Sequence, residues 1–279
     1  MQKNPPILEM TLPLITVVIC TYNGERYLAA TLDSVLTQTY PNMEVVIVDD
    51  GSSDATVSII RQHVERDSRI RWFARKNAGL PASRNYAFAQ AQGEWIAIID
   101  QDDLCYPERL ARQVAVAAAY PSAGLVFCDT HLIDGMGKII GNHLAPFTLP
   151  DSFIPKGLVA HLLLTKGCYV STQACFIKRS TINQMGVLDE SLRYACDYEY
   201  FIRTGLEFDF AYTRDTLSAW RVHPGQESAT NRNRFKEVRS VLGHYLSYTG
   251  MTLGTRLAIT QHFGKWLAAE LYYKARSQL

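Results

Sequence analysis

The sequence predicts an α/β fold in which a mainly parallel central sheet is flanked by helices. Apolar runs typical of strands alternate with helical patterns of ten to fifteen residues, and this alternation indicates βαβ units. The apolar run 95–99 contains three isoleucines and is typical of a strand buried on both faces. Three carboxylates, Asp100, Asp102 and Asp103, follow this strand, and α/β sheets bind their ligands beyond such strand ends.

Local patterns predict the elements of the first half in order. We expect strands at 14–20, 44–48, 69–73, 95–99 and 123–128, and helices at 28–36, 54–64, 82–92 and 107–120. Asp54 is expected to cap the second of these helices, and Gly93 is expected to close the third. Together these elements predict a Rossmann-like half.

Beyond residue 130 the patterns are less regular. A hairpin turn is expected at 134–138, a loop at 146–155, a helix at 158–164 and a strand at 170–178. A loop at 188–195 leads into a helix near 197–205, extended chain follows at 208–222, and one or two helices run from Arg234 onward.

Composition is typical of a soluble globular protein that is large enough to bury a full core. The chain has 279 residues, of which 47% are hydrophobic and 20% are charged. Its 28 basic and 27 acidic residues give a net charge of +1, which argues against nucleic acid as a partner. The six cysteines form no C-x-x-C pair, so we expect reduced thiols and no zinc site. Because residues 1–6 hold no apolar segment typical of a signal peptide, we expect a cytoplasmic protein.

The three carboxylates after the central strand predict a metal site. They would repel one another unless a cation lay among them, and closely spaced carboxylates bind Mg²⁺ or Mn²⁺ together with ligand phosphates. The alternative is a polar loop whose acids cap the following helix. The sequence has neither a G-x-G-x-x-G turn nor a G-x-x-x-x-G-K-[ST] loop, which argues against dehydrogenases and P-loop enzymes.

Three groups of motifs together resemble the family 2 glycosyltransferases, which have the GT-A fold and use nucleotide sugars. The first group runs from Thr21-Tyr22-Asn23 to Asp49-Asp50-Gly51, the second joins Ala82-Ser83-Arg84-Asn85 to Asp100-Gln101-Asp102-Asp103, and the looser third is Cys196-Asp197-Tyr198-Glu199 with Trp220-Arg221-Val222-His223. The resemblance implies a GT-A catalytic domain over residues 1–230 and a C-terminal helical extension over 231–279. Within the catalytic domain, 14–130 is the expected nucleotide-sugar-binding half and 131–230 the smaller acceptor-binding half.

The resemblance also implies a role for each motif residue. The nucleotide sugar would contact Thr21, Tyr22, Asn23, Asp49, Asp50, Arg84, Asp100 and Asp103, with Tyr22 and Asp50 at the base and Asp100 at the ribose. Asp102 would bind the Mn²⁺ or Mg²⁺ that bridges the diphosphate, Asp103 could serve either purpose, and His223 would reach the metal or the diphosphate. Each residue also has a structural explanation: Tyr22 could pack on the next helix, Asp50 could satisfy its own turn, and Arg84 could form a surface ion pair. Their joint placement at one sheet edge favours the functional interpretation.

The position that matches the family's general base is Asp197. Inverting transfer needs a carboxylate that takes the proton of the acceptor hydroxyl. The family usually has an acid immediately before this base, whereas this chain has Cys196, so Glu199 and Asp189 stay rival candidates. The structural alternative for Asp197 is a helix N-cap, which would contribute about 1 kcal/mol.

By this resemblance the protein is a hexosyltransferase that moves one sugar, with inversion, from a nucleoside-diphosphate sugar, expected to be a UDP-sugar. The expected acceptor is a saccharide or a lipid-linked intermediate of bacterial surface polysaccharide or glycolipid. Processive members carry Gln-x-x-Arg-Trp after the base, whereas the Arg71-Trp72 pair here lies far before it. Two alternatives are a non-catalytic sugar-nucleotide-binding protein and a nucleotidyltransferase, although the latter would normally show a glycine-rich phosphate loop.

The C-terminal stretches 262–267 and 271–276 combine aromatic residues with Lys and Arg, as helices at membrane interfaces do. This pattern predicts peripheral contact with the inner face of the cell membrane. The alternative is a helix that packs its apolar face on the catalytic domain.

Overall fold

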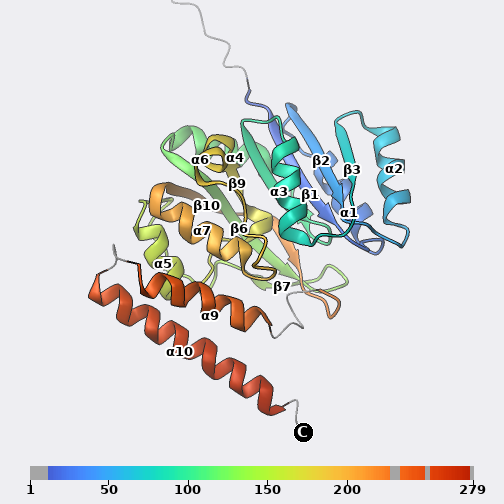
Figure 1. The fold of residues 1–279 in the computed structure, drawn as a ribbon. Coiled ribbons are helices and arrows are strands. Elements are labelled where there is room, and N and C mark those ends of the chain that lie inside the picture. The colour runs from blue at the N-terminus through green and yellow to red at the C-terminus, as the bar shows by residue number, and fades with distance from the viewer. Residues whose placement is uncertain (1–11, 227–232, 249–251, 277–279) are drawn as a thin grey trace, which may run out of the picture.

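The computed structural model describes residues 12–226, 233–248 and 252–276, with side chains described as far as residue 268. Within these residues one ten-stranded sheet runs through the molecule in the order β3-β2-β1-β4-β9-β6-β10-β5, with β7 beside β6 and β8 beside β10 (Figure 1). Residues 1–6, on which the expectation of a cytoplasmic protein rests, lie outside the described part of the chain. The α/β architecture predicted from the sequence is confirmed.

The strands and helices have the following bounds. The strands are β1 (Ile15–Thr21), β2 (Met43–Asp49), β3 (Ile70–Ala74), β4 (Trp95–Asp100), β5 (Leu104–Cys105), β6 (Ala123–Ile133), β7 (Ile139–Asn142), β8 (Phe153–Ile154), β9 (Phe176–Lys178) and β10 (Asp209–Arg221). The helices are α1 (Leu28–Leu36), α2 (Thr56–Arg66), α3 (Leu80–Gln90), α4 (Arg109–Ala119), α5 (Leu158–Lys166), α6 (Arg179–Met185), α7 (Cys196–Glu207), α9 (Asn233–Leu246) and α10 (Leu253–Arg276), with a 3₁₀ turn at Thr172–Ala174.

The strand register decides where the site can form. β3, β2, β1 and β4 run parallel, β6 and β10 run parallel to each other, and the short β9 lies antiparallel between β4 and β6. Thr21 pairs with Asp49, and Cys20 pairs with Asp100, so β1, β2 and β4 end at the same level. Their carboxyl ends therefore form one edge, as the sequence predicted.

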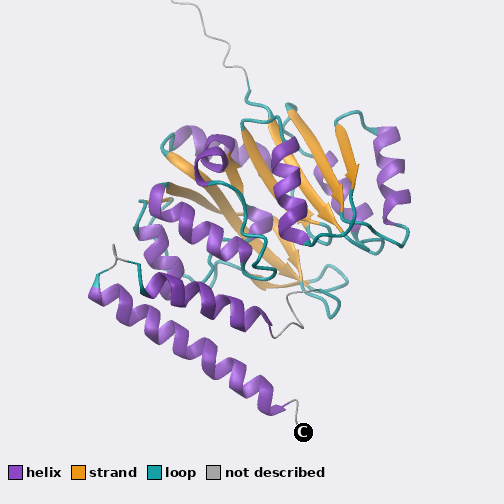
Figure 2. Cartoon of the chain, in the orientation of Figure 1, coloured by secondary structure: helices purple, strands orange, loops and turns teal. Residues whose placement is uncertain are grey.

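Alternate residues of the central strands pack on opposite layers of helices. One face, including Val18, Val46 and Ile98, packs in one core with residues of α3, α5 and α7. The other face, including Val17 and Val45, packs in a second core with residues of α1, α2 and α4. Figure 2 shows helices on both sides of the strands, an arrangement that explains why these strands are apolar at every position.

The C-terminal helices lie together away from the sheet, where α10 contacts α9 and α5 (Figure 1). Ile259 is fully buried, and Phe263 and Trp266 pack against the main core. The aromatic residues of 262–267 therefore face the protein, which favours the packing alternative, whereas side chains of 271–276 lie outside the described residues. Among the described helices, none combines the length and the hydropathy that crossing a bilayer requires.

Two helix-end predictions were wrong. Helix α3 ends at Gln90 with Ala91 at its C-cap, so Gly93 does not close it. A Cβ on Gly93 would lie 2.5 Å from the backbone nitrogen of Thr16, so the close approach of β1 requires glycine there. Helix α2 has Ala55 rather than Asp54 at its N-cap position, although Asp54 still accepts a hydrogen bond from the N–H of Thr56 at 3.0 Å.

The strand predicted at 170–178 was also wrong over most of its length, because only β9 pairs with neighbouring strands there. Side chains of α4 donate hydrogen bonds to the carbonyls of the residues just before β9. The fully buried Arg109 donates from Nη2 to the carbonyls of Cys175, at 2.9 Å, and Ile98, at 3.0 Å. Gln113 donates to the carbonyl of Ala174 at 2.7 Å. These bonds attach the segment before β9 to α4, beside one backbone bond from the Ile98 N–H to the Cys175 carbonyl at 3.2 Å.

We predict that Arg109→Met destabilises the fold, because it removes the two hydrogen bonds from Nη2 to the buried carbonyls of Ile98 and Cys175. Hydrogen bonds to charged groups contribute ~1.5–3 kcal/mol each, so the free energy of unfolding should fall by ~2 kcal/mol or more in urea titrations. Arg112→Met is the matched control on the same helix. Arg112 is 55% exposed in its ion pair with Asp215, and solvent screens such a pair, so its loss should change the free energy of unfolding much less than the loss of Arg109. Equal losses in the two variants would contradict the role of Arg109.

Candidate active site

The candidate site lies at the edge where β1, β2 and β4 end and where α3 begins. The side chain of Gln101, directly after β4, joins this edge to the loop after β1. Its Oε1 accepts hydrogen bonds from the Thr21 hydroxyl at 2.6 Å and from the Tyr22 N–H at 2.9 Å. The Tyr22 side chain stays 49% exposed and is free to stack on a planar ligand, so it does not pack on α1 as the alternative supposed.

Asn23, which is exposed, and Asp49, which is buried, both form hydrogen bonds that hold the loops. Asn23 has a left-handed φ of 50° and donates its N–H to the Ser52 hydroxyl at 2.9 Å, while its side-chain oxygen accepts the Ser53 N–H. Asp49 is 2% exposed and accepts the Ser52 N–H with both oxygens at 3.3 Å. The structure therefore brings both residues to the site edge as supports of the loops that end β1 and β2.

Asp50 orders the loop before α3. It is 4% exposed, and its carboxylate accepts the N–H groups of Ala78 and Gly79 and the hydroxyl of Ser83, at 2.8–2.9 Å. Three of its roughly four acceptor positions are thus occupied. A cavity of about 290 Å³ beside this loop is lined by Asn77, Ala78, Gly79, Pro81, Glu190 and Arg193.

Arg84, on α3, forms an ion pair with Asp100 at the end of β4. The Arg84 side chain is only 3% exposed, so it is not the surface pair of the structural alternative, while Asp100 is 31% exposed. Burial acts to lower the pKa of Arg84, but the charges of Asp100 and Asp197 outweigh burial and raise it. Arg84 therefore stays charged, and Asp100, at 31% side-chain exposure, keeps an open side toward a ligand.

Asp102 and His223 meet although 121 residues separate them, with 2.9 Å between Oδ2 and Nε2. Both are partly open, at 21% and 12% side-chain exposure. Burial and the charge of Asp100 raise the pKa of Asp102, and His223 opposes this rise. The structure therefore brings these two residues together at this edge.

Asp103 points away from this opening. It is 1% exposed, and its Oδ1 accepts the backbone N–H of Arg221 at 2.7 Å. Burial, together with the charges of Asp102 and Asp100, raises the pKa of Asp103 well above its ordinary value. The mutual repulsion expected of the three acids is present, and Asp103 uses its carboxylate to attach β10.

The donor set of Asp102 and His223 fits a divalent cation. A carboxylate oxygen and an imidazole nitrogen are suitable ligands for Mn²⁺, and diphosphate oxygens and water commonly complete such a shell. In the described part of the chain no cluster of three or more His, Cys, Asp or Glu side chains could hold a metal alone. These two side chains could supply two ligands to a cation, with the remaining positions left to a bound phosphate compound.

Asp197 lies in the first turn of α7, where Ala195 and not Asp197 holds the N-cap position, so the structural alternative of an N-cap does not apply. Its oxygens accept hydrogen bonds from the Thr172 hydroxyl and, at 2.8 Å, from the Tyr198 N–H. Burial, followed by the charge of Asp197, raises the pKa of Cys196 to about 12. The residue that replaces the family's usual acid is therefore a neutral thiol.

The rival candidates for the base are committed to other contacts. Glu199 forms an ion pair with Arg203 at 2.9 Å, one helical turn further along α7. Asp189 accepts hydrogen bonds from the N–H and the hydroxyl of Ser191, which lower its pKa. Among the three candidates, Asp197 is the one whose charge raises the pKa of Arg84.

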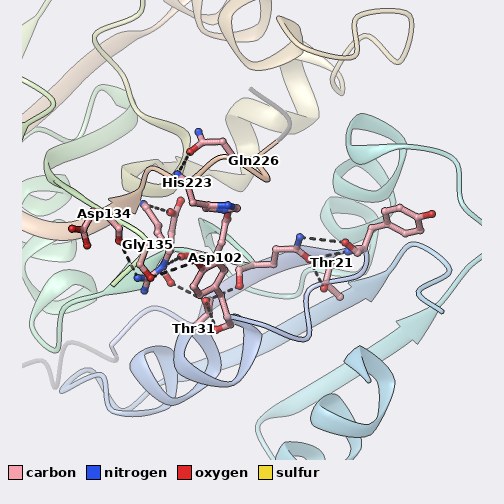
Figure 3. A network of polar contacts seen from close by, with 12 residues as sticks. Thr21, Thr31, Asp102, Asp134, Gly135, His223 and Gln226 are labelled. Carbon is pink, nitrogen blue, oxygen red and sulfur yellow. Dashed lines mark hydrogen bonds and ion pairs between the residues drawn. The ribbon is translucent and has the colours of Figure 1, made fainter. Parts of the chain in front are cut away.

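Sequence reasoning missed four residues that build this site: Tyr27, Thr31, Gln101 and Arg221. The Thr31 hydroxyl donates to the backbone carbonyls of both Gln101 and Asp103, at 2.8 and 2.9 Å (Figure 3). Gln101 stands at the second position of Asp100-Gln101-Asp102-Asp103. Tyr27, Thr31 and Arg221 contact residues that are far from them in the sequence. The Arg221-x-His223 spacing was the one signal that could have indicated Arg221.

Comparison with known proteins places the chain in a family. Residues 16–185 match the family described as glycosyl transferase family 2, which is more than half of the chain. An uncharacterized glycosyltransferase of Rickettsia typhi is 28% identical over 241 residues, which cover 84% of this chain and 72% of that protein.

Two solved structures share the fold. The Staphylococcus aureus protein TarS, residues 1–349 in complex with UDP-GlcNAc, has a TM-score of 0.67 at 19% identity and is matched over 91% of this chain and 71% of its own. The mannosyltransferase PcManGT of Pyrobaculum calidifontis, in complex with GDP-Man and Mn²⁺, has a TM-score of 0.67 at 18% identity, over 96% and 76%. The chain therefore belongs to glycosyl transferase family 2, adopts the GT-A fold and is a glycosyltransferase.

Proposed function

We propose that the protein transfers a single hexose from a nucleoside-diphosphate sugar to an acceptor hydroxyl, with inversion and with the help of a divalent cation. One observation carries this proposal: the open Tyr22 ring, the Arg84–Asp100 pair and the Asp102–His223 pair gather at one sheet edge. They match, in order, the base, the ribose and the diphosphate of one extended ligand. UDP-GlcNAc in one structural neighbour and GDP-Man in another agree with a donor of this class.

At the nucleoside end, the ring of Tyr22 would stack on the base, and the loop that Asp50 orders would form the wall of the base site. A ring half open to water can stack on a uracil or a guanine. A UDP-sugar remains our expectation from the sequence. Asp100, held by Arg84 on one side and open on the other, would accept a ribose hydroxyl as a charge-assisted hydrogen bond.

At the diphosphate, Asp102 and His223 would hold a Mn²⁺ or Mg²⁺ ion, as Mn²⁺ in PcManGT also suggests. Such an ion neutralises the charge of the diphosphate as the glycosidic bond breaks. The two protein ligands are attached to different strands, so a correct fold of β4 and β10 is needed to bring them together.

For the transfer itself, Asp197 would accept the proton of the acceptor hydroxyl while that oxygen attacks the anomeric carbon. The bond from this carbon to the diphosphate breaks as the new bond forms, and attack from the opposite side inverts the configuration. Thr172 and the Tyr198 N–H orient the carboxylate. The neutral thiol of Cys196 adds no second charge beside it, so the non-catalytic alternative does not follow from this substitution.

The acceptor we propose is a saccharide or lipid-linked intermediate of bacterial surface polysaccharide or glycolipid, in keeping with bacterial relatives. Family membership argues against the nucleotidyltransferase alternative. A panel of sugar nucleotides, scored for hydrolysis with and without Mn²⁺, identifies the donor and separates a catalyst from a protein that only binds. Contact with the inner membrane face stays a prediction, which rests on the aromatic and basic residues of 262–267 and 271–276.

We predict that Asp102→Asn abolishes the Mn²⁺-dependent part of nucleoside-diphosphate binding without unfolding the protein. Asparagine lacks the charge that a divalent cation requires, and loss of this charge relieves repulsion with Asp100. Isothermal calorimetry with and without Mn²⁺ measures the binding, and thermal unfolding provides the control. Unchanged Mn²⁺-dependent affinity would rule out Asp102 as a ligand.

We further predict that Asp197→Asn slows turnover at saturating donor by at least ~10²-fold, because a positioned base contributes about that much. Donor affinity should hardly change, since asparagine keeps the size of the side chain. Glu199→Gln, in the same helix turn, should stay near wild type because Glu199 is paired with Arg203.

Hydrolysis of the donor, with water in place of the acceptor, measures these rates. Near-normal turnover of Asp197→Asn would move the base to Glu199 or Asp189. A loss of both rate and donor affinity would mean instead that Asp197 helps to form the donor site.

A further inference from the structure

Arg221, the last residue of β10, holds the loop that carries Asp102. Its Nε donates to the backbone carbonyl of Asp102 at 2.9 Å, and its backbone N–H donates to the Asp103 carboxylate at 2.7 Å. The residue is 6% exposed. Figure 3 shows this group of polar contacts between the labelled Thr31, Asp102 and His223. One side chain therefore fixes the backbone of the loop from which Asp102 projects.

The same arginine is held in place by Tyr27, immediately before α1. The Arg221 guanidinium lies over the Tyr27 ring, 4.6 Å from its centroid. The imidazole of His223 packs against the same ring, with 5.0 Å between centroids and planes tilted by 52°. Tyr27 thus contacts both Arg221 and His223, and it limits the orientations that either can adopt.

Two further hydrogen bonds connect Arg221 and Tyr27 to the β6–β7 hairpin. Arg221 Nη1 donates to the carbonyl of Asp134 at 3.4 Å, and the Tyr27 hydroxyl donates to the carbonyl of Gly135 at 3.5 Å. These contacts are long and so are weaker than the bond to Asp102. With one face on Tyr27, Nε and Nη1 bonded to carbonyls and the residue only 6% exposed, the guanidinium has little surface left for a ligand.

We propose that Arg221 is a positioning residue, which sets the Asp102 carboxylate and the His223 imidazole for a divalent cation, with Tyr27 as its platform. This inference rests on the proposed cation-dependent function. The reason is that Arg221 acts on both expected ligands. It holds the backbone carbonyl of Asp102 by a hydrogen bond, and it shares the Tyr27 ring with His223, which lies two residues further along the chain. Outer partners that orient metal ligands commonly contribute 10–100-fold to metal affinity.

The test measures binding of uridine and guanosine diphosphate by calorimetry, with Mn²⁺ and with EDTA. Arg221→Met and Tyr27→Leu should each weaken the Mn²⁺-dependent affinity by ~10-fold or more. The affinity in EDTA should be unchanged. Arg221→Lys keeps the charge but not the planar donor and should recover part of the loss, while Tyr27→Phe keeps the ring and should recover most of it. Arg112→Met serves as the matched arginine control.

Each outcome decides between explanations. Equal weakening in Mn²⁺ and in EDTA would mean that Arg221 contacts the nucleotide directly, and full Mn²⁺-dependent affinity in Arg221→Met and Tyr27→Leu would mean that it positions nothing; either result overturns the inference. Tyr27→Leu also covers the case in which Arg221→Met fails to fold. If the wild-type protein gains no affinity from Mn²⁺, the proposed cation-dependent function fails, and this inference falls with it. The two failures are therefore distinguished by the wild-type titration.

Discussion

Three aspartates within four residues at the end of a buried strand are the constraint on which the site depends. Each carboxylate has its own counterpart: Arg84 from α3 for Asp100, His223 for Asp102, and the N–H of Arg221 for Asp103. Because those counterparts come from α3 and β10, the acids can be accommodated only when the two halves of the chain share one sheet. The fold is thus a condition for charge compensation, and the remaining unbalanced charge suits a cationic ligand.

The elements of the first half could be predicted because their signals are local. Unbroken apolar runs identified the strands that are buried on both faces, and helical periodicity identified α1, α2 and α4. The wrong predictions share a different cause. Gly93 is required by contact with Thr16 of β1, and the segment before β9 is attached in large part by the side chains of Arg109 and Gln113. Such side-chain-to-backbone contacts leave no periodic pattern in the sequence.

The candidate site divides in the same way. Asp100, Asp102, Tyr22 and Arg84 were identified because they stand in contiguous motifs beside strand or helix ends. Gln101 and Arg221 stand in the same motifs but received no role, because the residues that they contact lie 79 and 119 positions away in the sequence. Asp49, Asn23 and Asp103 were expected to touch the ligand, yet their contacts in the structure are with the protein. A motif indicates that a residue belongs to a site without indicating which side of the site it supports.

Gln101 has a consequence for the energetics of ligand binding. It lies between Asp100 and Asp102 in the chain, yet its side chain holds the Tyr22 backbone, so any shift of the metal loop is passed to the stacking ring. Two ligands that bias one shared element are thermodynamically coupled, and the coupling is reciprocal. Under the proposed function, binding of the cation and binding of the nucleoside base would therefore be coupled. Each would change the affinity of the protein for the other by the same factor, and the Gln101 amide would connect the two sites.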